Sequence, residues 1–576
     1  MSQLPPFLGF DGIEYPQISV AIQPGGTVAQ GGTSWVLGVS QLGTLTLGGA
    51  EWSNVTDDLV GFSRAIGRTT AVDSANIGIC SVTLDNEKGD YDSSNPNSPY
   101  LSANTLDSQQ SSLEAVNTNG WTAGTNTAIS SSATVGGYHG VRALQLNKIV
   151  STGTAKANTD DRLCPPKTAV KATVWYRAGS TSRPCKVRVL FKDELGIFIS
   201  DILSDPVTDN STGWVQATVS GTSPALTSYA SIELQAASDG NAVVGENHYA
   251  DNVMLQTSGI EVGMPVQLTA MFEGITYGRF EGTVTNLVMD LGMEPYVTLE
   301  LGDGLEALGR AHLSNAAPAG DLEYTGQRIG RLADVASWPT SKRILDTGQT
   351  RLGPTTFGAA ALELMRKVEM TEFGLLFVDA NGNLIFYDRH QTTSAARSTT
   401  VQIDLEDVEL TALEAERSRD LAWNQVSITR GAVGEGDEPL EQVANDLTSQ
   451  SRFGLLEFPG QVGELLPQDE DALAMAQGLL LRGRVPKLRI GEIRIEAITL
   501  DLWPSLLPLT LLDRIRVSRD YGPNTITEEL LIQGLREEVS LNPPKWSFIL
   551  TTSNPHAAPS LFVLGTSQVG SGRLGW

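Results

Sequence analysis

The sequence predicts a mainly β, multidomain protein, and three observations lead to this prediction. The chain has 576 residues, whereas single hydrophobic cores stop growing at roughly 250 to 300 residues. It contains 58 glycines and 27 prolines, and only 18% of its residues are charged, which favours short strands joined by turns over long helices. Apolar and polar residues alternate along several segments, as they do in half-buried strands.

The first half of the chain predicts one β domain interrupted by another. Strand patterns such as ISVAI and NIGICSVTLDN lead to a turn-rich cluster that ends near residue 101. Serine, threonine, asparagine and alanine then dominate, and alternating strands run on to residue 258 before the earlier pattern returns. We expect residues 1–101 and 259–316 to form one domain, with 102–258 inserted in a loop, where insertions are tolerated.

The second half predicts two further units and a tail. Residues 317–400 combine apolar residues at helical spacing with the hairpin GLLFVDANGNLIFYDRH, which indicates a small α+β domain. Residues 401–552 hold more strands, a helix at DEDALAMAQGLLLRGR and a closing strand meander, and 553–576 form a C-terminal tail. This meander shares an order of elements with the one that begins at PVQLT, with FEG at 280–282 and IQG at 532–534 in matching places. Either one β unit is duplicated, or two meanders that contain glycine look alike.

Composition argues against several classes of function. The formal net charge of −26 opposes specific nucleic-acid binding, because such affinity comes mainly from basic residues that neutralise phosphates. We expect neither a secretion signal nor a membrane span. The five histidines are scattered without a metal or triad motif, so the protein is expected not to be an enzyme. Cys164 and Cys185 are interpreted as two reduced thiols, with one disulfide between them as the alternative.

The insert carries the candidate binding residues. Period-two alternation places one set of side chains in a core and leaves a polar face with aromatic members. A sugar needs a flat apolar ring for its C–H face and planar hydrogen-bonding groups for its hydroxyls. The candidate glycan contacts are Trp175, Arg177, Tyr229, Glu233 and Gln235. The alternative is an ordinary solvated face, because antiparallel sheets normally have one polar side.

Several segments outside the insert resemble a known family. The stretches GFSRAIGRTTAVDSANIGICSVTLDNEKGDYDSSNPNSPY, GMPVQLTAMFEGITYGRFEGTVTNLVMD, GDGLEALGRA, GQRIGRLADVASWP and FVLGTSQVGSGRLGW resemble minor tail proteins of actinobacterial siphophages, of the baseplate hub or tail-associated type. The resemblance implies two tail-tube-like β-barrel domains in each chain, 1–101 with 259–316 and 401–552. It also implies a homotrimer at the virion tail tip that contacts the tail tube, the distal tail protein, the tape-measure protein and other minor tail proteins.

The insert resembles a family of carbohydrate-binding modules through GYHGVRALQLN, AVKATVWYRAG, GWVQATVSG, YASIELQAAS and HYADNVMLQ. This resemblance implies a jelly-roll β-sandwich that binds host-envelope polysaccharide, and a structural calcium held by Glu114 and Asp251, with no other cofactor required. The leading hypothesis is a structural hub that closes the tail tube. The alternative is a host cell-wall glycan adhesin, and a cell-wall hydrolase is disfavoured because no nucleophile motif is visible.

Overall fold

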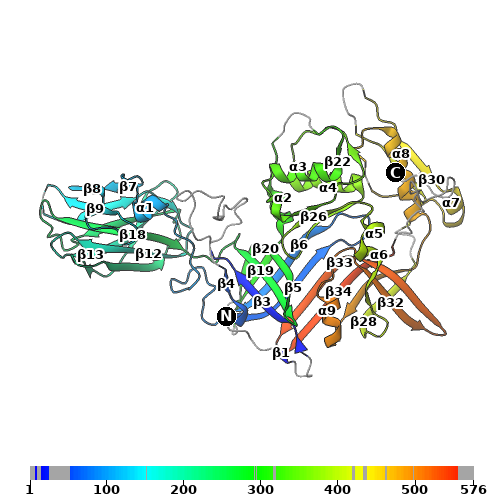
Figure 1. Ribbon diagram of the computed structural model, residues 1–576, viewed down its shortest axis with the longest axis horizontal. Helices are drawn as coiled ribbons and strands as arrows, with labels where there is room; N and C mark the ends of the chain where they lie inside the picture. Colours follow the sequence, from blue (N-terminus) through cyan, green and yellow to red (C-terminus); the bar gives the residue numbers. More distant parts are fainter. Residues whose placement is uncertain are drawn as a thin grey trace.

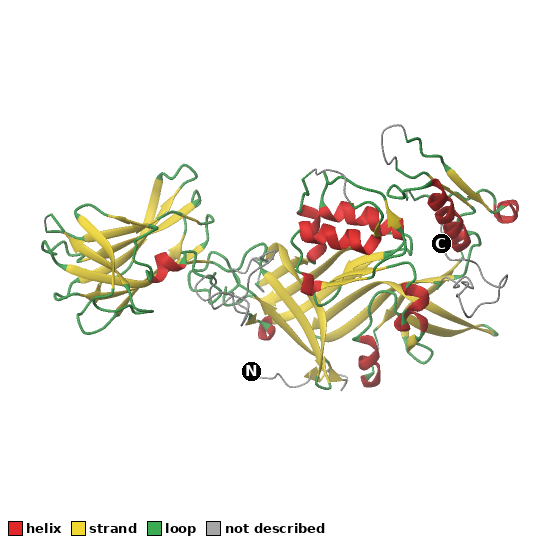
Figure 2. Cartoon of the chain, turned by 45° about the horizontal axis from the view of Figure 1, so that its top comes forward, coloured by secondary structure: helices red, strands yellow, loops and turns green. Residues whose placement is uncertain are grey.

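The protein has a large β-rich body and a separate β lobe that projects from it, as Figure 1 shows for the computed structural model. The described residues are 7–8, 14–24, 52–150, 152–290, 292, 295–314, 320–417, 422–431, 437–460, 463–496 and 499–555. Strands far outnumber helices in both lobes, which confirms the predicted mainly β, multidomain fold (Figure 2). Most of the predicted C-terminal tail, residues 556–576, lies outside the described residues.

The projecting lobe is a two-sheet sandwich built from the predicted insert. One sheet contains β7 (Trp121–Ala123), β10 (Ala155–Thr159), β11 (Arg162–Leu163), β13 (Pro184–Lys192), β14 (Phe198–Leu203), β15 (Val207–Thr208) and β17 (Tyr229–Ala236). The other contains β8 (Thr127–Ser132), β9 (Ala143–Lys148), β12 (Ala169–Ala178), β16 (Val215–Thr222) and β18 (Asn247–Thr257). Apolar side chains from both sheets form one core, and the helix α1 (Ser108–Ser112) covers an end of it.

The two ends of the insert lie side by side where the sandwich joins the body. Leu101 forms an antiparallel bridge with Ser258, and the amide of Gly259 donates to the carbonyl of Tyr100 at 2.8 Å. The amide of Ala169, at the start of β12, donates to the carbonyl of Ser93 in the body at 2.8 Å. The sandwich is therefore attached through a short, paired junction, as expected for a domain inserted into a loop.

One sheet of 13 strands forms the framework of the body. Its N-terminal strands are β3 (Gln17–Ile22), β4 (Ser53–Asn54), β5 (Leu59–Gly67), β6 (Asn76–Asp85), β19 (Pro265–Phe272), β20 (Ile275–Met289) and β21 (Tyr296–Gly302). Its C-terminal strands are β27 (Val401–Asp404), β28 (Leu410–Glu416), β31 (Arg489–Ile495), β32 (Arg514–Tyr521), β33 (Asn524–Leu541) and β34 (Pro544–Ser553). A separate two-stranded pair joins β1 (Phe7–Leu8) to β2 (Glu14–Tyr15).

This sheet contains the same six-stranded arrangement twice. We call β3-β19-β20-β21-β6-β5 the N-terminal array and β27-β32-β33-β34-β31-β28 the C-terminal array, each written in the order in which its strands pair. Each array has a long central strand, β20 or β33. Its first half pairs with the preceding strand in the array, β19 or β32, and its second half pairs with the following strand, β21 or β34. The change of partner falls at Thr283 in β20 and at Leu531 in β33. The two arrays differ at one edge, because β3 is antiparallel to β19 whereas β27 is parallel to β32.

The match between the arrays extends to their irregularities. The ladder between β20 and β21 shifts register between Val284 and Asn286, and that between β33 and β34 shifts between Ile532 and Gly534, at the same distance beyond the change of partner. The last pair in each array also shifts after its first residue, Leu59 in β5 and Leu410 in β28, although the second shifts of these pairs, after Ala65 and after Leu413, do not match. The shift in the β19–β20 pair likewise has no counterpart between β32 and β33. Because a one-residue shift turns every following side chain to the other face, matching bulges mark the arrays as repeats of one unit.

The two arrays are joined edge to edge and share one core. The second half of β33 pairs with β5, from Gly534 opposite Gly67 to Ser540 opposite Gly61. Apolar residues of both arrays belong to a single buried cluster. The prediction treated residues 401–552 as a separate barrel domain, but its long strands continue the sheet of the N-terminal array within the same chain. Sequence patterns show which residues are strands and not which edges meet, so this junction was missed.

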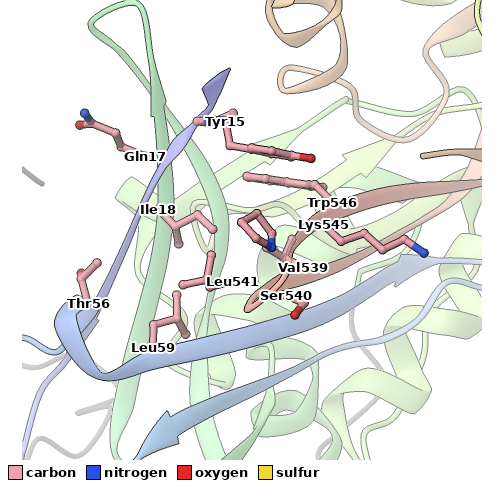
Figure 3. A pocket seen from close by; sticks show the side chains of 12 residues that line it. Tyr15, Gln17, Ile18, Thr56, Leu59, Val539, Ser540, Leu541, Lys545 and Trp546 are labelled. Carbon is pink, nitrogen blue, oxygen red and sulfur yellow. The ribbon is translucent and has the colours of Figure 1, made fainter. Parts of the chain in front are cut away.

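The sheet curls until its two arrays face each other across an apolar seam (Figure 3). Tyr15 and Ile18, at the N-terminal edge, line this seam together with Val539, Leu541 and Trp546 from β33 and β34. The short helix α9 (Trp503–Leu506) places the fully buried ring of Trp503 within 6.0 Å of Tyr15 and 5.1 Å of Trp546, measured between ring centroids. Aromatic contacts across the seam therefore stabilise the curved shape of the sheet.

The predicted α+β unit packs on this framework. Its sheet consists of β23 (Arg343–Leu345), β25 (Leu375–Val378) and β26 (Leu384–Tyr387), with α2 (Gly304–Arg310), α3 (Thr325–Val335) and α4 (Ala361–Glu372) above it (Figure 1). β25 is buried throughout because Leu375 and Phe377 join the main core, whereas Leu376 and Val378 pack beneath the helices. Smaller elements nearby are β22 (Glu323–Tyr324), β24 (Arg351–Leu352), α5 (Gln391–Ser394) and α6 (Ala396–Thr399).

A further small unit interrupts the C-terminal array. It comprises β29 (Gln425–Ile428), β30 (Gln442–Asn445), α7 (Leu447–Phe453) and α8 (Asp469–Gly483), and α8 is the helix predicted from DEDALAMAQGLLLRGR. Its core gathers around Trp423, whose indole nitrogen donates to the carbonyl of Leu479 at 2.7 Å. Among the described residues, none of the helices combines the length and apolar character needed to span a membrane.

Candidate functional site

An aromatic cluster lies on the outer face of the five-stranded sheet of the insert. The ring of Trp175, in β12, stacks on Tyr138 with centroids 3.9 Å apart and planes 11° from parallel. Trp214, just before β16, meets Tyr138 edge-on at 6.3 Å. Tyr138 comes from the loop between β8 and β9 and is 44% exposed. The cluster therefore presents a flat aromatic surface to solvent, as sugar rings require.

Arg177 has a supporting position beside this cluster. One guanidinium nitrogen donates to the carbonyl of Val135 at 3.0 Å, and another donates to the carbonyl of Ser211 at 3.1 Å. These carbonyls belong to the loops that carry Tyr138 and Trp214. Arg177 was predicted as a direct sugar contact. In the structure its planar guanidinium group instead connects the two loops that carry the aromatic residues.

The loop that carries Tyr138 is also held by carboxylates. Asp251, in β18, lies opposite Trp175 in the strand register and accepts a hydrogen bond from the amide of His139 at 2.8 Å. Glu114 accepts from the amide of Val141 at 3.1 Å. Both residues of the predicted calcium site therefore contact the loop 133–142. Burial raises the pKa of Asp251 to about 6, despite several backbone hydrogen bonds that lower it, and the nearby Glu114 charge raises it further.

The surroundings of Asp251 fit a hard cation. Asp251 is fully buried, and its Oδ1 atom has no hydrogen-bond partner among the described residues. Gly137 leaves room beside it, because a Cβ there would lie 2.6 Å from the carbonyl oxygen of Arg142, 2.9 Å from that of His139 and 3.1 Å from Asp251 Oδ2. Carboxylate and carbonyl oxygens that converge on one space are the donors that calcium prefers.

The other three predicted glycan contacts lie on the opposite side of the sandwich. Tyr229, Glu233 and Gln235 belong to β17, which is in the other sheet. Glu233 is mostly buried and accepts hydrogen bonds from Gln235 at 2.6 Å, Lys156 at 3.2 Å and Arg188 at 3.3 Å. The five predicted residues therefore do not form one site. Alternation assigns each residue to a face of its own strand and does not reveal which sheet that strand joins.

Sequence reasoning missed Tyr138 and a buried polar network at the far end of the sandwich. His248 Nδ1 lies 2.6 Å from Asp209 Oδ2, and its Nε2 lies 3.3 Å from Glu246, which accepts from Arg183 at 2.8 Å. The Cys185 sulfur belongs to the same cluster, within 4.8 Å of the Asp209 and His248 ligand atoms. These residues are distant in sequence, so spacing gave no signal. The network is enclosed, and we interpret it as a polar clamp within the core.

The cysteines agree with the predicted reduced thiols rather than with the alternative of a disulfide. Cys80, Cys164 and Cys185 are all free and buried. Burial raises the pKa of Cys164 to about 11, which keeps this thiol protonated and unreactive near neutral pH.

No protein-family model matches the sequence, and no curated protein matches it either. Solved structures show partial similarity. A tail protein from Neisseria meningitidis is 12% identical, with 51% of this chain and 84% of that chain covered at a TM-score of 0.38. A 43 kDa tail protein of the prophage MuSo2 from Shewanella oneidensis is 18% identical, with the same coverage and a TM-score of 0.35.

A second group of similar structures consists of carbohydrate-binding modules. The CBM22-1 xylan-binding domain of Xyn10C from Paenibacillus barcinonensis is 18% identical, with 26% of this chain and 91% of that chain covered at a TM-score of 0.20. The chain is thus similar to tail proteins over about half of its length and to carbohydrate-binding modules over about a quarter of it.

Proposed function

We propose that the chain is a structural protein of a bacteriophage tail, a hub that closes the tail tube at its tip as a homotrimer. The observation that carries this proposal is the internal repeat of two arrays with the same strand order, the same change of partner and two bulges in matching places. A threefold ring can mate with a sixfold tube only if each chain offers two equivalent surfaces. Three chains with two arrays each supply six such units.

Two further features support a structural role in the tail. The segments that resemble minor tail proteins include β5, β6, β19 and β20, which belong to the N-terminal array. The net charge of −26 suits a channel through which DNA passes without adhering. In this role the chain contacts the tail tube, the distal tail protein, the tape-measure protein and other minor tail proteins, and it performs no catalysis.

The test is the copy number and symmetry of the chain in purified tails, measured by electron cryomicroscopy. Three copies around the tail axis, with both arrays at the same radius, are the expected result. One copy, six copies, or arrays at different radii would refute the hub.

We propose a second function for the insert, adhesion to host-envelope polysaccharide. The observation that supports this second function is the exposed ring of Tyr138, which stacks on Trp175. Trp175 lies six residues along β12 from Ala169, which contacts the body, so the cluster is about 20 Å from the junction at the usual rise of a strand. This position leaves the aromatic surface free for a long polymer. Hub and adhesin functions are compatible, because they use different lobes.

The proposed calcium belongs to this second function. Glu114, Asp251 and the carbonyls of His139 and Arg142 would hold the ion beside the loop 133–142. A bound calcium supplies positive charge that neutralises the buried Asp251 carboxylate. The residues themselves fasten the loop, and so they position Tyr138 for a sugar.

A further inference from the structure

Two of the strand edges that lack partners among the described residues are related to each other by the repeat of the two arrays. The first edge belongs to the second half of β20, beyond Val284. It lies on the side of β20 where β19 pairs with the first half of the strand and then ends. The second is the outer edge of β28, which pairs only with β31. Unpaired strand edges carry backbone donors and acceptors that favour the addition of another strand.

The chain itself contains the completed form of this junction. In the C-terminal array, the second half of β33 has the same place as the second half of β20, and its corresponding edge is filled by β5. β5 is the last strand of the N-terminal array, just as β28 is the last strand of the C-terminal array. The strand that would complete β20 in the same way is therefore β28. Within one chain β28 and β20 lie near opposite ends of the strand order, so the β28 that fills this edge belongs to a second copy.

The repeat also gives the register of the missing pairing. Gly534, just beyond the bulge of β33, corresponds to Asn286 just beyond the bulge of β20, so Arg536 and Glu537 correspond to Val288 and Met289. In the last strands, the neighbouring strand sets the match. Leu59 and Leu410 lie opposite Leu84 and Ile495, and the residues five places before these, Ile79 and Ile490, lie opposite Ala65 and Ala415. Arg536 pairs with Ala65. Val288 should accordingly lie opposite Ala415, and Leu287 opposite Glu416.

The side chains at these positions suit an interface. Val288 is 46% exposed and Met289 is 39% exposed, although both are large apolar residues on a strand. In the completed junction their places are held by Arg536 and by the buried Glu537, which is paired with Arg64. The new junction would instead place Val288 against Ala415, an apolar contact that is stabilised by exclusion of water.

We infer that β28 of one chain pairs antiparallel with residues 285–289 of β20 in the next chain, with Val288 opposite Ala415. This pairing extends the sheet from chain to chain and makes the junction between chains equivalent to the β5–β33 junction within each chain. The inference rests on the proposed hub, since it names the surface through which the hub assembles. It specifies the partner as a second copy of this chain and the contact as a continuous sheet.

The test is a disulfide in the purified full-length chain that carries Val288→Cys and Ala415→Cys. Residues directly opposite each other on antiparallel strands have Cα atoms about 4.5 to 5.5 Å apart, within the range that a disulfide spans. Mild oxidation should give covalent species larger than one chain under denaturing, non-reducing conditions, and neither single variant should give them beyond Cys–Cys background. The three natural cysteines are buried and do not compete.

A register control separates this pairing from simple proximity. Val288→Cys combined with Glu416→Cys shifts the pair by one residue and directs the two Cβ atoms to opposite faces, so it should cross-link at least tenfold less. Leu226→Cys, at a residue of the insert that is 75% exposed, combined with Ala415→Cys is the surface control. Equal cross-linking in the shifted or surface pair overturns the inference.

The outcomes distinguish this inference from the hub itself when native mass spectrometry of the same sample is included. A trimer without the Val288–Ala415 cross-link refutes the strand pairing and leaves the hub in place. The cross-link in an assembly other than a trimer establishes the pairing and refutes the threefold hub. A monomer without cross-links contradicts both.

Discussion

Arg64 and Glu537 form a fully buried ion pair across the junction of the two arrays. The Nε atom of Arg64, in β5, donates to Glu537 Oε1, in β33, at 3.1 Å. Arg279, the extra residue at the bulge in β20, lies with a guanidinium nitrogen 3.4 Å from the same oxygen. The triad therefore connects a strand of the C-terminal array to two strands of the N-terminal array. Burial lowers the pKa of Arg279 to about 9, although the Glu537 charge raises it.

Removal of Glu537 should destabilise the body. Glu537→Ala leaves two buried guanidinium groups without their counter-ion, a change that typically costs about 3 to 5 kcal/mol. The measurement is chemical denaturation of the full chain, followed by tryptophan fluorescence. Glu538→Ala is the matched control, because this half-exposed neighbour points to the other face and surface ion pairs contribute about 1 kcal/mol or less. Equal losses in the two variants would contradict the structural role of the triad.

The same carboxylate should make the body sensitive to acid. Burial by itself would raise the pKa of Glu537, but the charges of Arg279 and Arg64 outweigh burial and hold the pKa below its usual value of 4.5. A lowered pKa means that the stabilisation is present above pH 4.5 and is lost as the pH falls through the lowered value. Thermal unfolding between pH 7 and pH 3 should show a decline below pH 4.5 that is weaker in Glu537→Gln.

Trp503 should be the most costly single aromatic residue of the seam. It is fully buried and contacts Tyr15, Phe272, Trp546 and Phe548. Trp503→Ala leaves a cavity between the two arrays and should lower the free energy of unfolding by about 3 to 5 kcal/mol. Trp52→Ala, at a residue that is 46% exposed, should change it by about 0.5 kcal/mol or less. The free energies of unfolding of both variants, measured by chemical denaturation under one set of conditions, test this prediction.

Tyr138 should govern polysaccharide binding by the insert. Loss of its exposed ring in Tyr138→Ala should weaken binding of the full chain to host cell-wall polysaccharide about fivefold or more, since stacking on an aromatic ring contributes on the order of 1 kcal/mol or more. Trp175→Ala should act in the same direction, because it removes the ring on which Tyr138 stacks. Tyr229→Ala, on the opposite face, should leave binding unchanged in the same affinity-electrophoresis assay. If only Tyr229→Ala weakens binding, the sugar site lies on the other sheet of the sandwich.

Asp251 should link calcium to the stability of the insert. Its pKa is raised from 3.8 to about 6, mainly by burial, so without metal its contribution to stability is greatest at low pH and is lost as the pH rises through about 6. Calcium should therefore raise the melting temperature at pH 7.5 and do so less at pH 5. Asp251→Asn should be more stable than the natural chain in a chelator at pH 7.5, and calcium should not stabilise it further.

Asp160→Asn, at an exposed position of the insert, is the control for this effect. It should respond to calcium as the natural chain does. Scanning calorimetry with and without calcium provides the comparison, and an equal calcium response in Asp251→Asn would exclude this carboxylate as a ligand.

The sequence by itself determined the β-rich class, the strands and the presence of the insert. These features depend on local patterns, such as the alternation in KATVWYRAG and the turn residues after Asp85, which each segment carries on its own. The glycines of FEG and IQG also indicated the repeat, but they are not equivalent: Gly282 lies just before the change of partner at Thr283, whereas Gly534 lies beyond the change at Leu531. The bulges that confirm it came only with the register of neighbouring strands.

Only the tertiary structure decided which strand edges meet and which side chains share a surface. The junction of β5 with β33 brings together residues more than 450 positions apart, such as Arg64 and Glu537. Tyr138 reaches Trp175 from a loop, and Tyr229 lies behind the sandwich although its pattern resembles that of β12. Alternation orients a side chain relative to its own strand, whereas long-range pairing and core packing orient the strands relative to one another, and no local pattern encodes that second step.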